Sequence, residues 1–172
     1  AAPEAPARVR GLTPEAAAER LRNPEGLPSL AFWVAAIREL FEETGVLMAC
    51  DGAGAPVDCG DPGVADQVER CRKALMAGEA GLTALLARAG WFYDAARLRY
   101  LSHFITPASS PIRFTARFFV SPLPAGQEPR LFLEETSEGF WIGARDGYRR
   151  FRAGEMAMAE PAEYALGYLA QF

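Results

Sequence analysis

Three glutamates, Glu39, Glu42 and Glu43, fall within a stretch short enough to form a single helical turn. Because Glu42 and Glu43 follow Glu39 by three and four residues, a helix would project all three carboxylates to one side. At about 6 Å each like-charged pair costs about 0.7 kcal/mol in bulk water and about 3 kcal/mol at an effective dielectric of 20. The cluster therefore needs compensating positive charge. Arg38, four residues before Glu42, supplies part of that charge. Hard divalent ions such as Mg²⁺ prefer oxygen ligands, so this face could hold one together with water and substrate phosphates.

The helix that would carry these groups is predicted from Ser29 to Gly45. Pro28-Ser29 is a typical helix start, and Gly45 is a typical end. Between them, apolar residues recur at spacings of three and four, namely Leu30, Val34, Ile37, Leu40 and Phe41. A solvated helix face is the ordinary explanation for paired glutamates on a helix. Here Leu40 and Phe41 interleave the acids and Gly45 closes the helix, which weakens that explanation.

Shorter elements are expected on both sides of this helix. Residues 1–28 are predicted to be a lead-in segment outside the core, with one short helix after the N-cap Thr13 and Pro14. Gly, Pro and Asp make 51–63 an exposed loop. Two alternating runs, 97–104 and 114–120, indicate neighbouring antiparallel strands. The remaining predicted elements are helices at 64–76, 79–89 and 144–153, a strand at 139–142 and a helix after Pro161.

These elements predict one α/β or α+β domain, because neither an internal repeat nor a linker divides the chain. The three predicted strands all follow the main helix, and they make a thin sheet on which to bury so many helices. We therefore expect the opening strands of the domain either to lie upstream of residue 1 or to have been lost from this chain.

The composition limits the partners of the chain. Eighteen Lys and Arg against 22 Asp and Glu give a net charge of -4, which argues against a surface built to bind nucleic acid. Neither an apolar run long enough to span a membrane nor a signal peptide is visible, so a cytoplasmic location is expected. Cys50, Cys59 and Cys71 lack metal-type spacing, and the chain has a single histidine, so we expect free thiols.

The segment from Arg38 to Val46 resembles the second half of the Nudix box, which reads Arg-Glu-apolar-x-Glu-Glu-x-Gly-apolar. Every defined position matches: Arg38, Glu39, Leu40, Glu42, Glu43, Gly45 and Val46. The first half does not match, because Leu30 and Pro24 stand where the box has a Glu and a Gly. Such departures occur where an insertion separates the glycine-rich turn from the helix. The branch with this insertion contains acyl-CoA diphosphatases related to mammalian peroxisomal Nudix enzymes, and this chain looks like that branch.

The likeness to that branch extends along most of the chain from about residue 29. It is carried by residues 104–107, by residues 113–119, by the spacing of Glu135, Glu138 and Trp141, and by Pro161. The resemblance implies a mixed sheet sandwiched between helices, with residues 1–28 as the insertion and 29–172 as the Nudix hydrolase domain.

The resemblance also implies an activity: metal-dependent hydrolysis of a nucleoside diphosphate linked to another group, such as CoA or an acyl-CoA. Mg²⁺ or Mn²⁺ would be the cofactor. Glu42 and Glu43 would ligate the metal, and Glu39 would be a further ligand or the base that deprotonates water. Arg38 would orient the carboxylates, so that Arg38, Glu39 and Glu42 form the predicted catalytic set.

Three further residues are candidates for contacts with the substrate. Glu135 is a candidate for a final acid supplied from a distant loop, although ordinary surface acids in a hairpin explain it almost as well. Arg113 and Arg117 alternate with phenylalanines on a predicted strand and could hold phosphates through bidentate guanidinium contacts. A solvent-facing strand surface is an equal alternative, because residues 115 and 116 depart from the family pattern.

A second hypothesis belongs to another functional class. Leu30 and Pro24, at the places of the missing Glu and Gly, are compatible with a Nudix-like module that recognises a nucleotide without cleaving it. A homodimer through the helices at 64–89 would be compatible with either activity.

Overall fold

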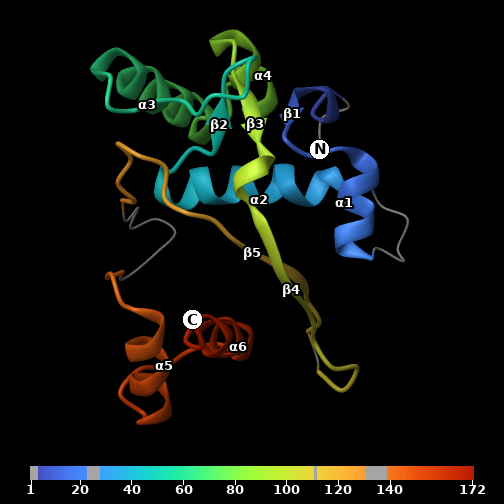
Figure 1. Cartoon of the computed structure of the whole chain (residues 1–172), viewed down its shortest axis with the longest axis vertical. Coiled ribbons are helices and arrows are strands. Elements are labelled where there is room, and N and C mark those ends of the chain that lie inside the picture. Colours follow the sequence, from blue (N-terminus) through green and yellow to red (C-terminus); the bar gives the residue numbers. More distant parts are fainter. Residues whose placement is uncertain (1–3, 23–27, 111, 131–138) are drawn as a thin grey trace. The chain divides into compact units, whose positions relative to one another are not determined.

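The computed structural model describes residues 4–22, 28–110, 112–130 and 139–172 (Figure 1). The chain forms two compact units, and each is described by itself. The first unit comprises Ala1–Arg99 and Val120–Ser137, and the second comprises Tyr100–Phe119 and Glu138–Phe172.

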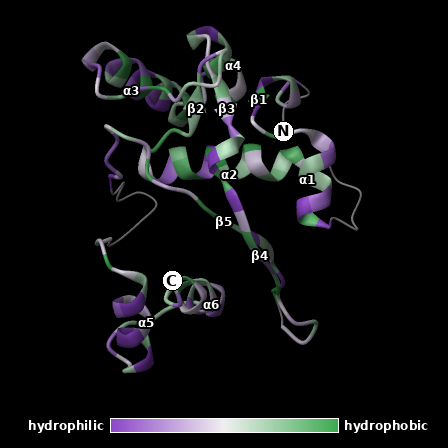
Figure 2. Cartoon of the chain, viewed as in Figure 1, coloured by the Kyte–Doolittle hydropathy of each residue, from purple (hydrophilic) through white to green (hydrophobic). Residues whose placement is uncertain are grey.

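The first unit is built around helix α2, Leu30–Thr44. Trp33, Ile37 and Phe41 recur at intervals of four residues and are completely buried, so one face of the helix forms the centre of the core. Hydrophobic and hydrophilic residues accordingly alternate along α2 (Figure 2). The helix ends at Gly45, whose backbone is left-handed with a φ of 74° and whose N–H donates to the carbonyl of Phe41. The structure therefore confirms the helix that the sequence predicts between Ser29 and Gly45.

A small mixed sheet completes the centre of the first unit. Its strands are β1 Val9–Arg10, β2 Ala49–Cys50 and β3 Phe92–Asp94, in the order β1-β3-β2. Strand β3 pairs in parallel with β1 and antiparallel with β2, so that Tyr93 lies opposite both Val9 and Ala49. Tyr93 is 1% exposed, and its hydroxyl forms a hydrogen bond with the hydroxyl of Thr83 at 2.9 Å.

Three further helices pack around α2 and this sheet. They are α1 Pro14–Leu21, α3 Pro62–Met76 and α4 Leu82–Ala89. Helix α1 contacts α2, α3 contacts both α2 and α4, and α4 contacts β3. In Figure 1, α2 crosses the first unit below the small sheet, whereas α3 and α4 lie at the top of the view. Short 3-10 turns occur at Pro6–Arg8 and Ala95–Arg97. The mixed α/β class expected from the sequence is thus observed.

The second unit contains a strand pair and two helices. Strands β4 Arg99–Ile105 and β5 Thr115–Val120, most of which lie in this unit, form a two-stranded sheet. The loop between them is closed by a hydrogen bond from the Thr106 N–H to the carbonyl of Phe114 at 2.9 Å. Helix α5 Ala144–Arg152 packs against α6 Glu160–Leu169, and α5 is largely hydrophilic (Figure 2). The strands predicted at 97–104 and 114–120 and both predicted helices of this region are confirmed.

Other expectations differ from the structure. The strand predicted at 139–142 is wrong, because these residues form a loop in which Phe140 and Trp141 are 56% and 79% exposed. Strands β1, β2 and β3 were not predicted, since strands of two or three residues are too short to show a period of two. Residues 1–28 were expected to lie outside the core. They instead contribute strand β1 and helix α1, and Val9, Ala17 and Leu21 are buried. Thr13 does cap α1, accepting from the N–H of Ala16 at 3.2 Å.

No helix among residues 4–22, 28–110, 112–130 and 139–172 is long and apolar enough to cross a membrane. The longest, α2 and α3, have 15 residues each, whereas a membrane-spanning helix needs about 20 apolar residues.

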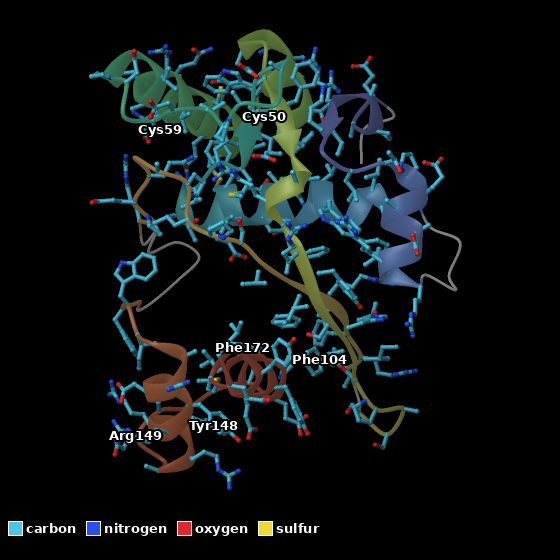
Figure 3. All side chains as sticks on the ribbon, viewed as in Figure 1. Cys50, Cys59, Phe104, Tyr148, Arg149 and Phe172 are labelled. Carbon is cyan, nitrogen blue, oxygen red and sulfur yellow. The ribbon has the colours of Figure 1, made fainter. Side chains whose placement is uncertain are left out.

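All three cysteines carry free thiols, as expected. In Figure 3, Cys50 lies on β2 and Cys59 in the chain before α3. Cys50 is 1% exposed; its burial, reinforced by the nearby carboxylates of Asp94 and Asp51, raises the pKa of its thiol to about 11. Burial also raises the pKa of the Cys59 thiol, but Cys59 is only half-buried.

We predict that iodoacetamide at pH 8 modifies Cys59 of the native protein much faster than Cys50. A thiol with a pKa near 11 is about one part in a thousand thiolate at pH 8, and burial further restricts access to it. Peptide mass spectrometry over time measures both rates, and labelling in urea is the control in which all three cysteines should react. Equal native rates for the two thiols would contradict the observed packing.

We also predict that Gly45→Ala lowers the free energy of unfolding by about 1 kcal/mol, because a side chain at a φ of 74° is strained. Urea unfolding measures the change. Gly52→Ala is the matched control: an added Cβ there meets only Phe92, at 3.7 Å, and the backbone is not left-handed. The control should be as stable as the unsubstituted protein, or slightly more stable.

Candidate active site

The predicted catalytic residues occupy the outward side of the last turns of α2. Burial of Trp33, Ile37 and Phe41 on the opposite side fixes the rotation of the helix. The side chains of Arg38 and Glu39 are therefore 44% and 51% exposed, and that of Glu42 is 22% exposed.

Arg38 bridges two of the three carboxylates. Its Nη1 donates to both carboxylate oxygens of Glu42 at 3.3 Å, and its Nη2 donates to Oε1 of Glu39. One planar guanidinium thus holds two acids next to each other. The catalytic orienting role that the resemblance implies for Arg38 stays a prediction. The structure brings together Arg38, Glu39 and Glu42.

Glu43 is not part of this bridge. Its side chain is exposed, and no ion pair joins it to another residue of the described ranges. Within those ranges, no three His, Cys, Asp or Glu side chains are close enough together to hold a metal ion. By donor type the residues do fit a hard divalent ion, because such ions prefer carboxylate oxygens and Arg38 gathers those of Glu39 and Glu42. The metal-ligand roles of Glu39, Glu42 and Glu43 stay predictions.

The inner side of the same helix end meets groups that sequence reasoning missed. Arg72 on α3 is 8% exposed, and its Nη2 donates to the backbone carbonyl of Glu42 at 2.7 Å. Gln127 is 9% exposed, and its amide both accepts from the N–H of Leu47 and donates to the carbonyl of Leu47, at 2.7 and 2.9 Å. Arg72 follows the buried Val68 by four residues, so a charge within the apolar face of a predicted helix was the signal that could have found it. No such pattern marks Gln127.

A pocket of about 80 Å³ lies beside this end of α2. Its lining includes Phe41, Glu69, Arg72, Gln127 and Arg130. The backbone N–H of Arg130 donates to the carbonyl of Thr44 at 2.9 Å, and its side chain forms an ion pair with Glu69 at 3.3 Å. Residues from α3 and from the 126–130 segment therefore surround the C-terminal end of α2.

The candidate substrate-binding residues lie elsewhere in the chain. Arg113 is exposed, and its Nε donates to the carbonyl of Thr106 at 3.1 Å, a contact that supports the β4–β5 loop. Arg117 is half-buried on β5. Both belong to the second unit. Glu135 lies outside the described residues, as does Glu138.

The departure in the first half of the motif has a structural correlate. Leu30 is the first residue of α2 and is 3% exposed, so it serves the hydrophobic core and not the outward side of the helix. Pro24 falls outside the described residues.

Comparison with known proteins gives one relative and one related structure. A curated protein of Caenorhabditis elegans named "Putative nudix hydrolase 7" is 31% identical over 142 residues, which are 81% of this chain and 44% of that protein. The chain thus spans less than half the length of this relative. The crystal structure of a NUDIX hydrolase from Alicyclobacillus acidocaldarius matches with a TM-score of 0.68 and 29% identity, over 92% of this chain and 72% of that one. No family model matches the chain. The match to the solved structure supports a Nudix-like fold.

We predict that a double-mutant cycle of Arg38→Met and Glu42→Gln gives a coupling of about 0.5 kcal/mol in the free energy of unfolding, because the two charges are in contact but remain partly exposed. The coupling should shrink in 1 M salt, which screens surface charges. The matched control is the cycle of Arg38→Met with Glu43→Gln, for which we expect no measurable coupling. Equal coupling in the two cycles would contradict the arrangement of the three acids.

Proposed function

We propose that this protein is a Nudix hydrolase that uses a divalent metal, Mg²⁺ or Mn²⁺, to cleave the pyrophosphate bond of a nucleoside diphosphate linked to another group. The observation that carries the proposal is the segment from Arg38 to Val46 at the C-terminal end of α2, in which one arginine binds two outward-facing carboxylates. The relative and the solved structure are both named as Nudix hydrolases, which supports the hydrolase part of the proposal.

In this proposal each residue of the helix end has a defined task. Glu42 and Glu43 hold the metal, and Glu39 either joins them or accepts a proton from the attacking water. Arg38 keeps the carboxylates of Glu39 and Glu42 oriented, through the hydrogen bonds described above. The bound ion would polarise the pyrophosphate and offset its negative charge.

Charge complementarity explains why an acidic protein can act on an anion. The net charge of the chain is -4, and the exposed glutamates alone would repel a diphosphate. Glu42 and Glu43 would hold a divalent cation, and its charge would offset that repulsion locally. Arg113 and Arg117 are candidates for additional phosphate contacts, and Glu135 is a candidate for a final acid.

For the substrate we propose CoA or an acyl-CoA among the nucleoside diphosphate derivatives. The support is the sequence likeness to the acyl-CoA diphosphatase branch, at residues 104–107 and at 113–119. A fold alone does not determine the substrate, so this part of the proposal depends on the experiment below. A cytoplasmic location and a homodimer through α3 and α4 stay predictions.

A second candidate function is nucleotide binding without turnover. It is favoured by Leu30, which is buried in the core at the place where the motif has a glutamate. A module of this kind would bind a nucleotide tightly without a metal and release no product.

The proposal is tested by incubating the protein with CoA, ADP-ribose and NADH in the presence of Mg²⁺ or Mn²⁺, and separating the products by chromatography. We expect metal-dependent cleavage of at least one diphosphate, complete loss of activity with EDTA, and a decrease in kcat of about a hundredfold or more in Glu42→Gln. Glu79→Gln, at an exposed position after α3, is the matched control and should keep full activity.

Two results would decide against this function. Absence of any metal-dependent product from every diphosphate would overturn it, and tight metal-independent binding of one of these compounds would then support the second candidate. Full activity in Glu42→Gln would show that the reaction takes place elsewhere.

A further inference from the structure

Three of the last four backbone carbonyls of α2 accept hydrogen bonds. The last four carbonyls of a helix lack partners within it. Here the carbonyl of Phe41 accepts from the N–H of Gly45 at 3.0 Å, and that of Thr44 accepts from the N–H of Arg130 at 2.9 Å. The carbonyl of Glu42 accepts from the guanidinium of Arg72 at 2.7 Å. Of these contacts, the last is the one made by a side chain that carries a charge.

Arg72 is well placed to act on this end of the helix. It is 8% exposed, so its hydrogen bond to the carbonyl of Glu42 is protected from competing water. The C-terminus of a helix carries a partial negative charge, which a cation stabilises most strongly when the contact is partly buried. Glu69, one turn earlier on α3, lines the same pocket but forms its ion pair with Arg130 at 3.3 Å.

Glu42 is consequently held at both ends. Arg38 binds its carboxylate from the solvent side, and Arg72 binds its backbone carbonyl from the core side. Unwinding or rotation of the last turn would move the carboxylates of both Glu42 and Glu43, and it would require breaking the contact with Arg72. The hydrogen bond from Arg72 to the backbone therefore fixes the backbone positions from which the side chains of Glu42 and Glu43 project.

We propose that Arg72 is a positioning residue for the reaction: its hydrogen bond to the backbone of Glu42 fixes the helical turn that presents Glu42 and Glu43. This inference rests on the proposed function of those glutamates. Arg72 acts through the backbone of the turn, which its guanidinium contacts at the carbonyl of Glu42. Displacement of catalytic groups by about 1 Å can cost about a hundredfold in rate, so a positioning contact of this kind has a measurable effect.

The test compares four variants of the full chain. Arg72→Met removes the donors and keeps an unbranched apolar stem. Arg72→Gln is polar but too short to reach the carbonyl, and Arg72→Lys can still donate to it. Arg70→Met is the matched control, because Arg70 is exposed on the same helix. Thermal unfolding establishes that each variant is folded under the conditions of measurement. Should Arg72→Met fail to fold, Arg72→Gln and Arg72→Lys make the same comparison.

Three measurements are made on each variant. Hydrogen exchange of the metal-free protein reports the opening of the backbone at residues 45–47. Titration with Mn²⁺, followed by electron paramagnetic resonance, gives the dissociation constant of the metal. Steady-state kinetics with the best substrate separates kcat from KM.

We expect Arg72→Met and Arg72→Gln to exchange residues 45–47 about tenfold faster or more, as for the loss of a hydrogen bond to a charged group. The Mn²⁺ dissociation constant should rise about fivefold, and kcat should fall about tenfold with KM changed less than about twofold. Arg72→Lys should recover at least part of each loss, and Arg70→Met should match the unsubstituted protein.

Two outcomes would contradict the inference, and they can be told apart from failure of the proposed function. If Arg72→Met and Arg72→Gln are merely less stable, with Mn²⁺ affinity and kcat equal to those of Arg70→Met, Arg72 has only a structural role. Equal hydrogen exchange in all variants would show that Arg72 does not hold the turn. If instead the unsubstituted protein neither binds Mn²⁺ nor turns over a diphosphate, the proposed function fails, and the exchange data alone still judge the backbone contact.

Discussion

The rotation of one helix about its own axis decides where all the candidate catalytic groups lie. Trp33, Ile37 and Phe41 are completely buried on one face of α2, and burial of each such side chain stabilises the fold by about 1.5–3 kcal/mol. The repulsion among partly exposed carboxylates on the other face is smaller, about 0.7 kcal/mol for a pair 6 Å apart in water. Hydrophobic burial therefore wins, and the acids must share the solvent side whether or not they repel each other.

The geometry of the Arg38 side chain determines how the C-terminal end of α2 accommodates those acids. Arg38 lies one position before Glu39 and four before Glu42, and its planar guanidinium binds both. Glu43 is left outside the bridge. The spacing of residues along a helix identifies which side chains share a face, but the choice of partners on that face depends on the reach and shape of the donor. A compact ammonium group at position 38 would not offer the same fork to two carboxylates.

These distinctions explain which features the sequence predicts and which it does not. The long periodic helix α2, its end at Gly45 and the N-cap Thr13 are all predicted, because each depends on local rules of spacing and backbone conformation. Strands β1 and β2 consist of two residues each, and tertiary pairing with β3 alone defines them. The loop at 139–142 was mistaken for a strand because apolar residues in a short run carry the same pattern whether or not a partner strand is present.

The residues of the candidate site divide in the same way, into those that local helix spacing predicts and those that only the fold brings together. The clustering of Arg38, Glu39 and Glu42 is predictable from sequence because these residues share one helix, and their contacts are those of neighbouring turns. Arg72 and Gln127 reach the helix end from 30 and 80 residues away, a proximity that only the fold creates. Arg72 left a trace in the sequence as a charge on an apolar helix face, whereas Gln127 binds Leu47 in a loop without periodicity and left none.

The two arginines at this helix end differ in what their removal or replacement can do. Arg38 is 44% exposed, and exposed ion pairs contribute about 0–1 kcal/mol, so another cation could take over its carboxylate contacts at little cost to the fold. Arg72 is 8% exposed and bonded to the backbone, and loss of a buried charged donor leaves a carbonyl without its partner. The contacts of Arg38 therefore contribute less to the stability of the fold than the buried contact of Arg72. At this helix end the outer arginine orients the carboxylates, and the inner arginine holds the backbone that carries them.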